Sequence, residues 1–201
     1  MRILFALALF CAAVFAGNLD CKNRVRYLPA ISFCPPANWE TIGDEAIREL
    51  MDEAKKTSDE TDKELYKKAD RQMNRRGLSK VVFALPHGED SLASAFALLT
   101  GPAPLSLDDF AQLNIASLQK TLGGKLTILG DDTLVSKPTA IKRFRLKVEL
   151  QGEIIAQTVY ILKPSAKTGA LATCAYEPKR QKEIEAICDD VMRSVEIKQD
   201  N

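Results

Sequence analysis

The chain has 201 residues, and its 28 lysines and arginines nearly balance 27 aspartates and glutamates, which gives a formal net charge of +1 at pH 7. A balance this close to neutrality argues against a nucleic-acid or polyanion binder that depends on bulk charge. The length is sufficient for one hydrophobic core, and no linker rich in Pro, Gly or Ser divides the chain, so we predict a single domain.

The first 16 residues, MRILFALALFCAAVFA, are predicted to be a signal peptide. The apolar run from Ile3 to Ala16 would span about 21 Å as a helix, which is too short to cross a hydrocarbon core of about 30 Å. Arg2 precedes the run, and Val14 and Ala16 stand where signal peptidase reads small residues before Gly17. We therefore expect residues 17–201 to form a secreted or periplasmic domain without a transmembrane span.

Two other interpretations of residues 1–16 stay open. A lipoprotein needs a small residue directly before its modified cysteine, whereas Cys11 follows Leu9 and Phe10 in the middle of the run. A buried N-terminal helix is the second alternative, and the abrupt change to the polar sequence GNLDCKNR argues against it.

Cleavage before Gly17 would leave four of the five cysteines, and an even number in a secreted chain indicates two disulfides. The four are Cys21, Cys34, Cys174 and Cys188. A zinc site is the rival interpretation, but no pair has the two-residue spacing of a zinc knuckle, and the single histidine, His87, is far from all four. We expect neither a metal nor a cofactor.

The N-terminal third combines a short strand with a charged helical segment. The strand is predicted around Ile31 to Cys34 and is stopped by Pro35 and Pro36. A helix follows, with Thr41 and Asp44 at capping-box spacing, and a second helix is predicted in TDKELYKKADRQMNRRG. The charged segment at about 43–77 is either a solvated part of the domain or an arm that binds a partner.

The middle of the chain alternates strands with one well-delimited helix. Strands are predicted at KVVFALP and LASAFALLTG, joined by the turn HGED, and two further short strands at KLTILG and TLVS. Between them, Ser106 and Asp109 form a capping box, and Gly123 and Gly124 end the helix. The residues predicted to face inward are Leu107, Phe110, Leu113 and Leu118.

A long hairpin, TAIKRFRLKVELQGEIIAQTVYILKP, has clear alternation in its first strand. One face carries Phe144, Leu146, Val148 and Leu150, and the other carries Arg143, Arg145, Lys147 and Glu149. We expect the first face to be buried and the second to be wet. Arg143, Arg145 and Lys147 are then the candidate contact for an acidic partner or anionic lipid headgroups, and an ordinary solvated face is the alternative.

The C-terminal part is predicted to be a strand, ALATCAYE, and a helix that begins at Pro178. Ile184, Ile187, Val191 and Val195 face inward in this helix. If the helix folds back over the strand, Cys188 lies about 15 Å along the helix and Cys174 about 10 Å back along the strand. Of three possible pairings we therefore predict Cys174 with Cys188, and Cys21 with Cys34.

About six to seven strands, several of them in hairpins, together with segregated helices indicate an α+β fold in which helices pack on an antiparallel sheet. The segments ISFCPPANW, LSLDDFAQLNIASLQ, the long hairpin and the closing DDVMRSVEI resemble the PsbP-like superfamily over roughly Val25 to Ile197. Within it, the bacterial exported DcrB-like domains of unknown function are the nearest. The resemblance implies an accessory or binding protein, and it transfers no catalytic residue.

The sequence therefore predicts an exported, non-catalytic accessory or binding protein of the cell envelope, whose partner is another envelope protein or a small ligand and not nucleic acid. The alternative is a hydrolase that uses His87 as general base, with Glu89 and Asp90 of HGED to orient it. A polar turn explains the same residues without chemistry.

Overall fold

A computed structural model of the chain describes residues 19–28, 31–58, 79–85, 94–135, 140–150 and 152–198, together with a few positions between 60 and 71. The predicted signal peptide, the HGED turn and most of the second charged helix lie outside the described residues.

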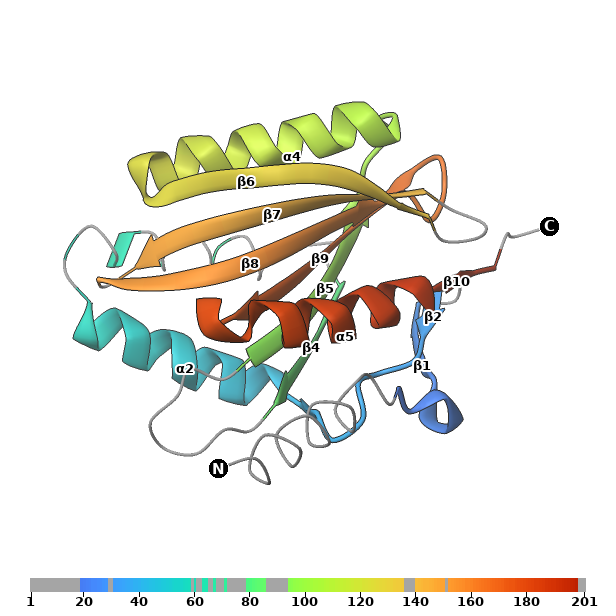
Figure 1. Ribbon diagram of the computed structural model, residues 1–201, viewed down its shortest axis with the longest axis horizontal. Coiled ribbons are helices and arrows are strands. Elements are labelled where there is room, and N and C mark those ends of the chain that lie inside the picture. The colour runs from blue at the N-terminus through green and yellow to red at the C-terminus, as the bar shows by residue number, and fades with distance from the viewer. Residues whose placement is uncertain are drawn as a thin grey trace, which may run out of the picture.

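Two antiparallel sheets form the framework (Figure 1). The larger has seven strands in the order β3-β4-β5-β9-β8-β7-β6, and the smaller has three in the order β1-β2-β10. Their bounds are β1 Val25–Leu28, β2 Ile31–Phe33, β3 Glu40–Thr41, β4 Ser79–Leu85, β5 Ser94–Pro102, β6 Leu126–Val135, β7 Ala140–Leu150, β8 Glu153–Leu162, β9 Thr168–Tyr176 and β10 Glu196–Ile197. The predicted α+β class and antiparallel sheet are confirmed.

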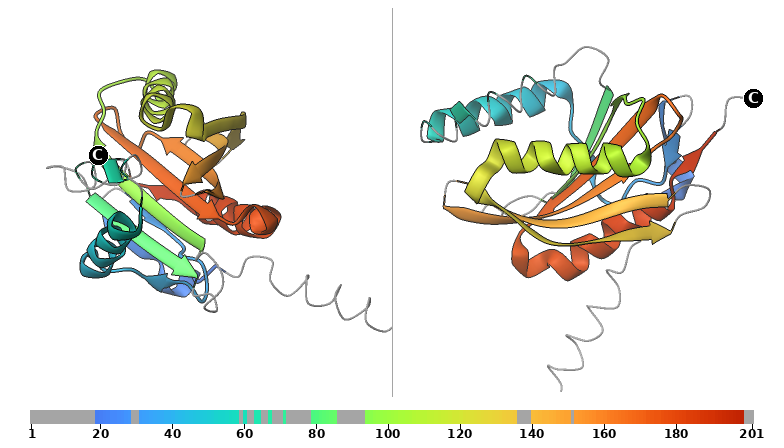
Figure 2. Two further views of the ribbon diagram at one scale, coloured as in Figure 1. Left: turned by 90° about the vertical axis from the view of Figure 1, so that its left-hand side faces the viewer. Right: turned by 90° about the horizontal axis from the view of Figure 1, so that it is seen from above.

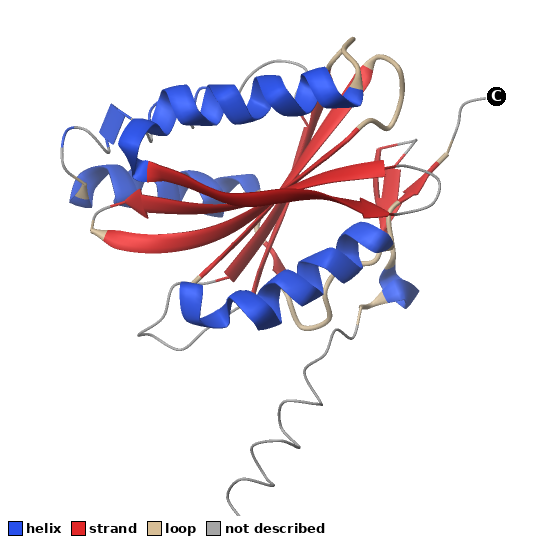
Figure 3. Cartoon of the chain, turned by 45° about the horizontal axis from the view of Figure 1, so that its top comes forward, coloured by secondary structure: helices blue, strands red, loops and turns tan. Residues whose placement is uncertain are grey.

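Helices lie on both faces of the seven-stranded sheet (Figure 3). On one face, α4 (Leu107–Leu122) lies across β6, β7 and β8 (Figure 2) and buries Ala111 against Leu146 and Val159. On the opposite face, α5 (Gln181–Arg193) buries Ile184 and Cys188 in the main core. A third helix, α2 (Asp44–Thr57), forms the first part of the charged segment at about 43–77. None of the helices among the described residues is long and apolar enough to cross a membrane.

The ends of α4 follow their local sequence signals. The Ser106 side chain accepts a hydrogen bond from the Asp109 backbone N–H at 3.1 Å, as the capping box predicts. Gly123 ends the helix with a φ of +55°, a conformation that glycine adopts without steric cost. One inward assignment is wrong: Leu113 is 60% exposed, because it lies on the side of α4 turned away from the sheet.

Three other predicted elements differ from the structure. The helix α2 begins at Asp44 after the N-cap residue Gly43 and has no side-chain cap, because Thr41 is part of β3 and pairs with Phe83. The two short strands predicted at KLTILG and TLVS are one continuous strand, β6, with a register shift between Ile128 and Gly130. Pro178 opens a short 3-10 turn, and α5 itself begins at Gln181.

The disulfides join Cys21 to Cys34 and Cys174 to Cys188, the pairing predicted from the sequence. The second bridge spans a Cα–Cα distance of 6.4 Å and fastens α5 to the central strand β9. The first links the N-terminal 3-10 turn Cys21–Asn23 to the end of β2. Each chain end is thus covalently attached to a neighbouring element of the fold.

Candidate functional site

The basic face predicted on β7 lies in the structure beneath α5. One face of β7 carries Arg143, Arg145 and Lys147, as predicted. Arg145 pairs with Thr158 of β8 and Lys147 pairs with Ala156, and both partners are buried. The prediction that this face is wet is wrong for the two arginines: their side chains are 12% and 28% exposed. Of the three basic residues only Lys147, nearer the end of the hairpin, is exposed, and so is Glu149 at the next position of the same face.

Arg143 is held by carboxylates from two different elements. On the adjacent edge strand, Asp132 accepts from Nε at 2.7 Å and from Nη2 at 2.5 Å, a bidentate geometry that the register places directly opposite Arg143. From α5, Asp189 accepts a hydrogen bond from Nη1. The hydrogen bond with Asp132 and the charge of Asp189 raise the pKa of Arg143 above its usual value.

Arg145 completes the cluster from the neighbouring position of the same face. Its Nε donates to Glu185 Oε1 at 2.5 Å, and its Nη1 donates to Asp132 Oδ2 at 3.3 Å. The other oxygen of Glu185 accepts from the Gln181 amide at 3.3 Å. Since both arginines donate to Asp132, they hold the pKa of that carboxyl below its usual range.

A buried tyrosine lies beneath the ion pairs. Tyr160 is fully buried on β8, and its hydroxyl donates to Asp189 Oδ1 at 2.8 Å. Burial, and then the negative charge of Asp189, raise the pKa of Tyr160 well above its usual value, so this hydroxyl stays protonated. Nearby, Tyr176 and Thr158 share a hydrogen bond of 2.7 Å, and burial raises the pKa of Tyr176 to about 12.

We call Asp132, Arg143, Arg145, Tyr160, Glu185 and Asp189 the charged cluster. Two arginines face three carboxylates there, and each of the six residues has a partner inside the cluster. The charged cluster links the edge strand β6, the strands β7 and β8, and the helix α5. Neither arginine presents an unpaired guanidinium to an acidic partner, so binding through this face stays a prediction, centred on Lys147.

The remaining predicted chemistry is the hydrolase alternative and a possible metal site. His87, Glu89 and Asp90, the candidates for the hydrolase alternative, lie outside the described residues. Within the part of the chain that the structure describes, no group of three or more His, Cys, Asp or Glu side chains could hold a metal ion.

Sequence reasoning missed the acidic half of the charged cluster. Glu185 and Asp189 are four residues apart and flank the inward positions Ile184 and Cys188 of a correctly predicted helix. Two acidic residues at this spacing, next to the apolar face of a helix, could have indicated that the helix supplies carboxylate partners to the two arginines that alternate along β7. Asp132 gave no such signal, because its role depends on the register of β6.

Comparisons with known proteins support the fold alone. No family model and no curated protein sequence matches this chain. A Pseudomonas aeruginosa protein of unknown function, PA94, described as a putative regulator, superposes with a TM-score of 0.54 at 12% identity, covering 64% of this chain and 88% of its own. Cyanobacterial PsbP (CyanoP) from Synechocystis sp. PCC 6803 superposes with a TM-score of 0.53 at 9% identity, covering 90% of this chain and 91% of its own. The architecture of the chain is therefore PsbP-like.

Proposed function

We propose that this protein is an exported, non-catalytic accessory or binding protein of the cell envelope. The observation that carries the proposal is the pair of disulfides, one of them wholly buried between β9 and α5. Disulfides persist in oxidising compartments and are rare in a reducing cytosol. The predicted signal peptide at residues 1–16 supports the same location, with residues 17–201 as one domain.

The charged cluster supports a structural role for these polar residues. An acid–base catalyst needs a group whose protons can exchange with a substrate, and a nucleophile needs an activating base. Here the carboxylates bind arginines, and the Tyr160 hydroxyl is bound to Asp189 in the protein interior. The resemblance to DcrB-like exported domains favours the same interpretation, with another envelope protein or a small ligand as the partner.

Location is tested first, with the full chain and a variant that lacks residues 1–16, each carrying the same C-terminal tag. We expect the full chain in the envelope fraction, processed before Gly17 and oxidised, and the shortened chain in the cytosol with free thiols. The same compartment for both would contradict the proposal.

Partner binding is tested by affinity capture from envelope extract. The wild type is compared with Lys147→Glu and with Lys182→Glu, a matched charge reversal at an exposed lysine of α5. We expect one protein to be enriched by the wild type and by Lys182→Glu, and to be depleted with Lys147→Glu. Equal capture by all three would exclude the basic end of β7 and direct attention to the 43–77 segment.

A catalytic function is tested separately by screening the wild type against His87→Ala with ester, amide and phosphoester substrates. We expect no turnover by either protein. Turnover by the wild type that is lost in His87→Ala would overturn the non-catalytic proposal in favour of the hydrolase.

A further inference from the structure

The two disulfides differ in their access to solvent. Cys174 and Cys188 are both fully buried in the main core. Cys34 is fully buried as well, but its partner Cys21 is exposed on the N-terminal 3-10 turn. A reductant in solution can therefore approach the first bridge at Cys21 while the second is shielded by the packing of α5 on the sheet.

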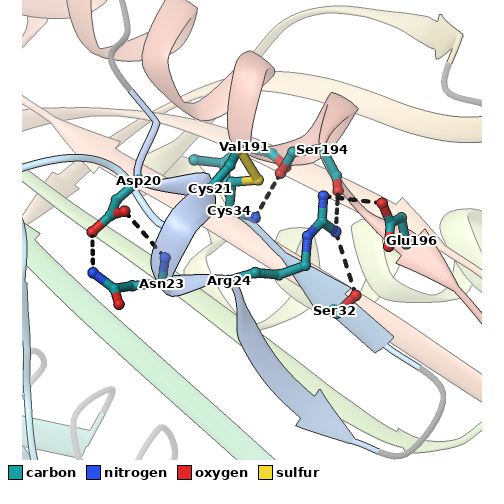
Figure 4. Close-up of a disulfide and its surroundings, with 9 residues drawn as sticks. All are labelled: Asp20, Cys21, Asn23, Arg24, Ser32, Cys34, Val191, Ser194 and Glu196. Atoms are coloured by element: carbon teal, nitrogen blue, oxygen red, sulfur yellow. Dashed lines mark hydrogen bonds and ion pairs between the residues drawn. A yellow bond between two sulfur atoms is a disulfide. The ribbon is translucent and has the colours of Figure 1, made fainter.

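The first bridge closes a segment that holds the end of α5. We call this segment, described at residues 19–28 and 31–34, the N-terminal strap. Arg24 of the strap donates from Nη1 to the Ser194 carbonyl at 3.1 Å and pairs through Nη2 with Glu196 at 3.1 Å (Figure 4). The backbone N–H of Cys34 donates to the Ser194 hydroxyl at 2.9 Å. Three contacts from the strap thus hold the C-terminal end of α5 and the residues after it, two at Ser194 and one at Glu196.

Strand pairing and apolar packing extend this attachment. In β2, Ser32 pairs with Glu196 and Ile31 with Ile197 of β10. Phe33 is fully buried, and its ring lies 6.0 Å from the rings of both Phe83 and Phe96 in the main core. Opening the strap would therefore expose core side chains and release β10 together with it.

We infer that Cys21–Cys34 is a redox-sensitive disulfide whose reduction loosens the strap and the C-terminal end of α5, while Cys174–Cys188 stays oxidised and keeps the rest of the fold intact. This inference goes beyond the proposed accessory function and does not depend on any partner. The reductant it requires is a dithiol, either a small molecule or a thioredoxin-type protein.

The exchange proceeds in two balanced steps. A thiolate of the dithiol attacks Cys21 Sγ on the side away from Cys34, forming a mixed disulfide and expelling the Cys34 thiolate, which takes up a proton. The second thiolate of the reductant then attacks the mixed disulfide, forms the oxidised reductant and releases the Cys21 thiolate. Two electrons pass from the dithiol to the Cys21–Cys34 bond.

The test is a titration of the purified oxidised protein with dithiothreitol, with alkylation and peptide mapping at each concentration. We expect Cys21 and Cys34 to become alkylated at a dithiothreitol concentration at least about tenfold lower than Cys174 and Cys188. Hydrogen exchange on the same samples should speed up at residues 31–34 and 194–197, by up to about 100-fold as expected for a closed loop of this length.

Two variants separate the strap contacts from the chemistry. Arg24→Met in the oxidised protein should speed up exchange at residues 194–197 with both disulfides intact, whereas Arg26→Met, at an exposed neighbour on β1, should not. Reduction of both bridges at one concentration would overturn the inference. Selective reduction of Cys21–Cys34 without faster exchange at residues 194–197 would overturn it equally.

Discussion

Arg143 is the residue on which the charged cluster depends most, because it links Asp132 of the edge strand to the buried Asp189 of α5. Replacing Arg143 by Met leaves Asp189, only 8% exposed, without its main counter-charge. We expect a loss of about 3 kcal/mol in the free energy of unfolding, measured by urea denaturation at pH 7. Lys147→Met, at the exposed end of the same face, should change it by less than about 0.5 kcal/mol. Equal effects of the two substitutions would show that the cluster does not hold α5.

Asp132 gives the cluster a defined response to acid. Its folded pKa is lowered by Arg143 and Arg145, so its contribution to stability is fully present above the unfolded value of about 3.9 and is lost as the pH falls through the folded pKa. Unfolding free energies measured between pH 6 and pH 2 should therefore fall less steeply for Asp132→Asn than for the wild type. Asp131→Asn, beside Phe144 on the other face of β6, is the matched control. An unchanged slope for Asp132→Asn would contradict the assignment.

The alternation of Arg143 and Arg145 could be predicted from the sequence, but their partners could not. Glu185 and Asp189 lie 40 and 46 residues further along the chain from the arginines they bind. Local periodicity assigns a strand face, and it does not indicate whether a later helix will cover that face. Periodicity alone therefore indicates a solvated or partner-binding surface, whereas the environment of the two arginines in the structure is largely internal.

The Phe110 ring of α4 lies close against Gly169 of β9. A Cβ atom at Gly169 would overlap the Phe110 ring and lie 2.8 Å from the Cβ of Ala103. We expect Gly169→Ala to lower the unfolding free energy by about 1–3 kcal/mol, because α4 must shift outward. Thermal and urea unfolding would measure this loss.

The control for this prediction is Gly124→Ala, where an added Cβ has no heavy atom within 4 Å. Combining Gly169→Ala with Phe110→Leu should recover part of the stability if the Phe110 ring is the obstacle. Failure of that double variant to recover any stability would show that the steric contact is not the cause.

Elements with complete local signals were the ones predicted best. The two ends of α4 are marked by residues close to each end, Ser106 and Asp109 at the start and Gly123 at the finish. These signals can be recognised without any distant contact. The capping of α2 by Thr41 failed because Thr41 pairs with Phe83 in β3. In β6, a register shift near Leu129 hides the continuity of the strand, since an irregularity in pairing is set by the neighbouring strand and not by composition.

In the whole molecule, α5 is attached both to the central sheet and to the N-terminal strap. Cys174–Cys188 fastens its middle to β9, and the N-terminal strap holds its end through Arg24 and Cys34. Loops of 13 and 14 residues closed by these bridges would each stabilise the fold by about 3 kcal/mol in the chain-entropy model. Of the small sheet β1-β2-β10, the sequence predicts only β2, around Ile31 to Cys34, because β1 and β10 are short and β10 lies far along the chain from its partner β2.

Peptide mapping without reduction, on protein recovered from the envelope fraction, tests the central claim that this is an exported, disulfide-bonded protein. We expect linked peptides for Cys21 with Cys34 and for Cys174 with Cys188, together with a mature N-terminus at Gly17. Free thiols at these four positions, a Cys21–Cys174 peptide, or a chain that retains Met1 would contradict it.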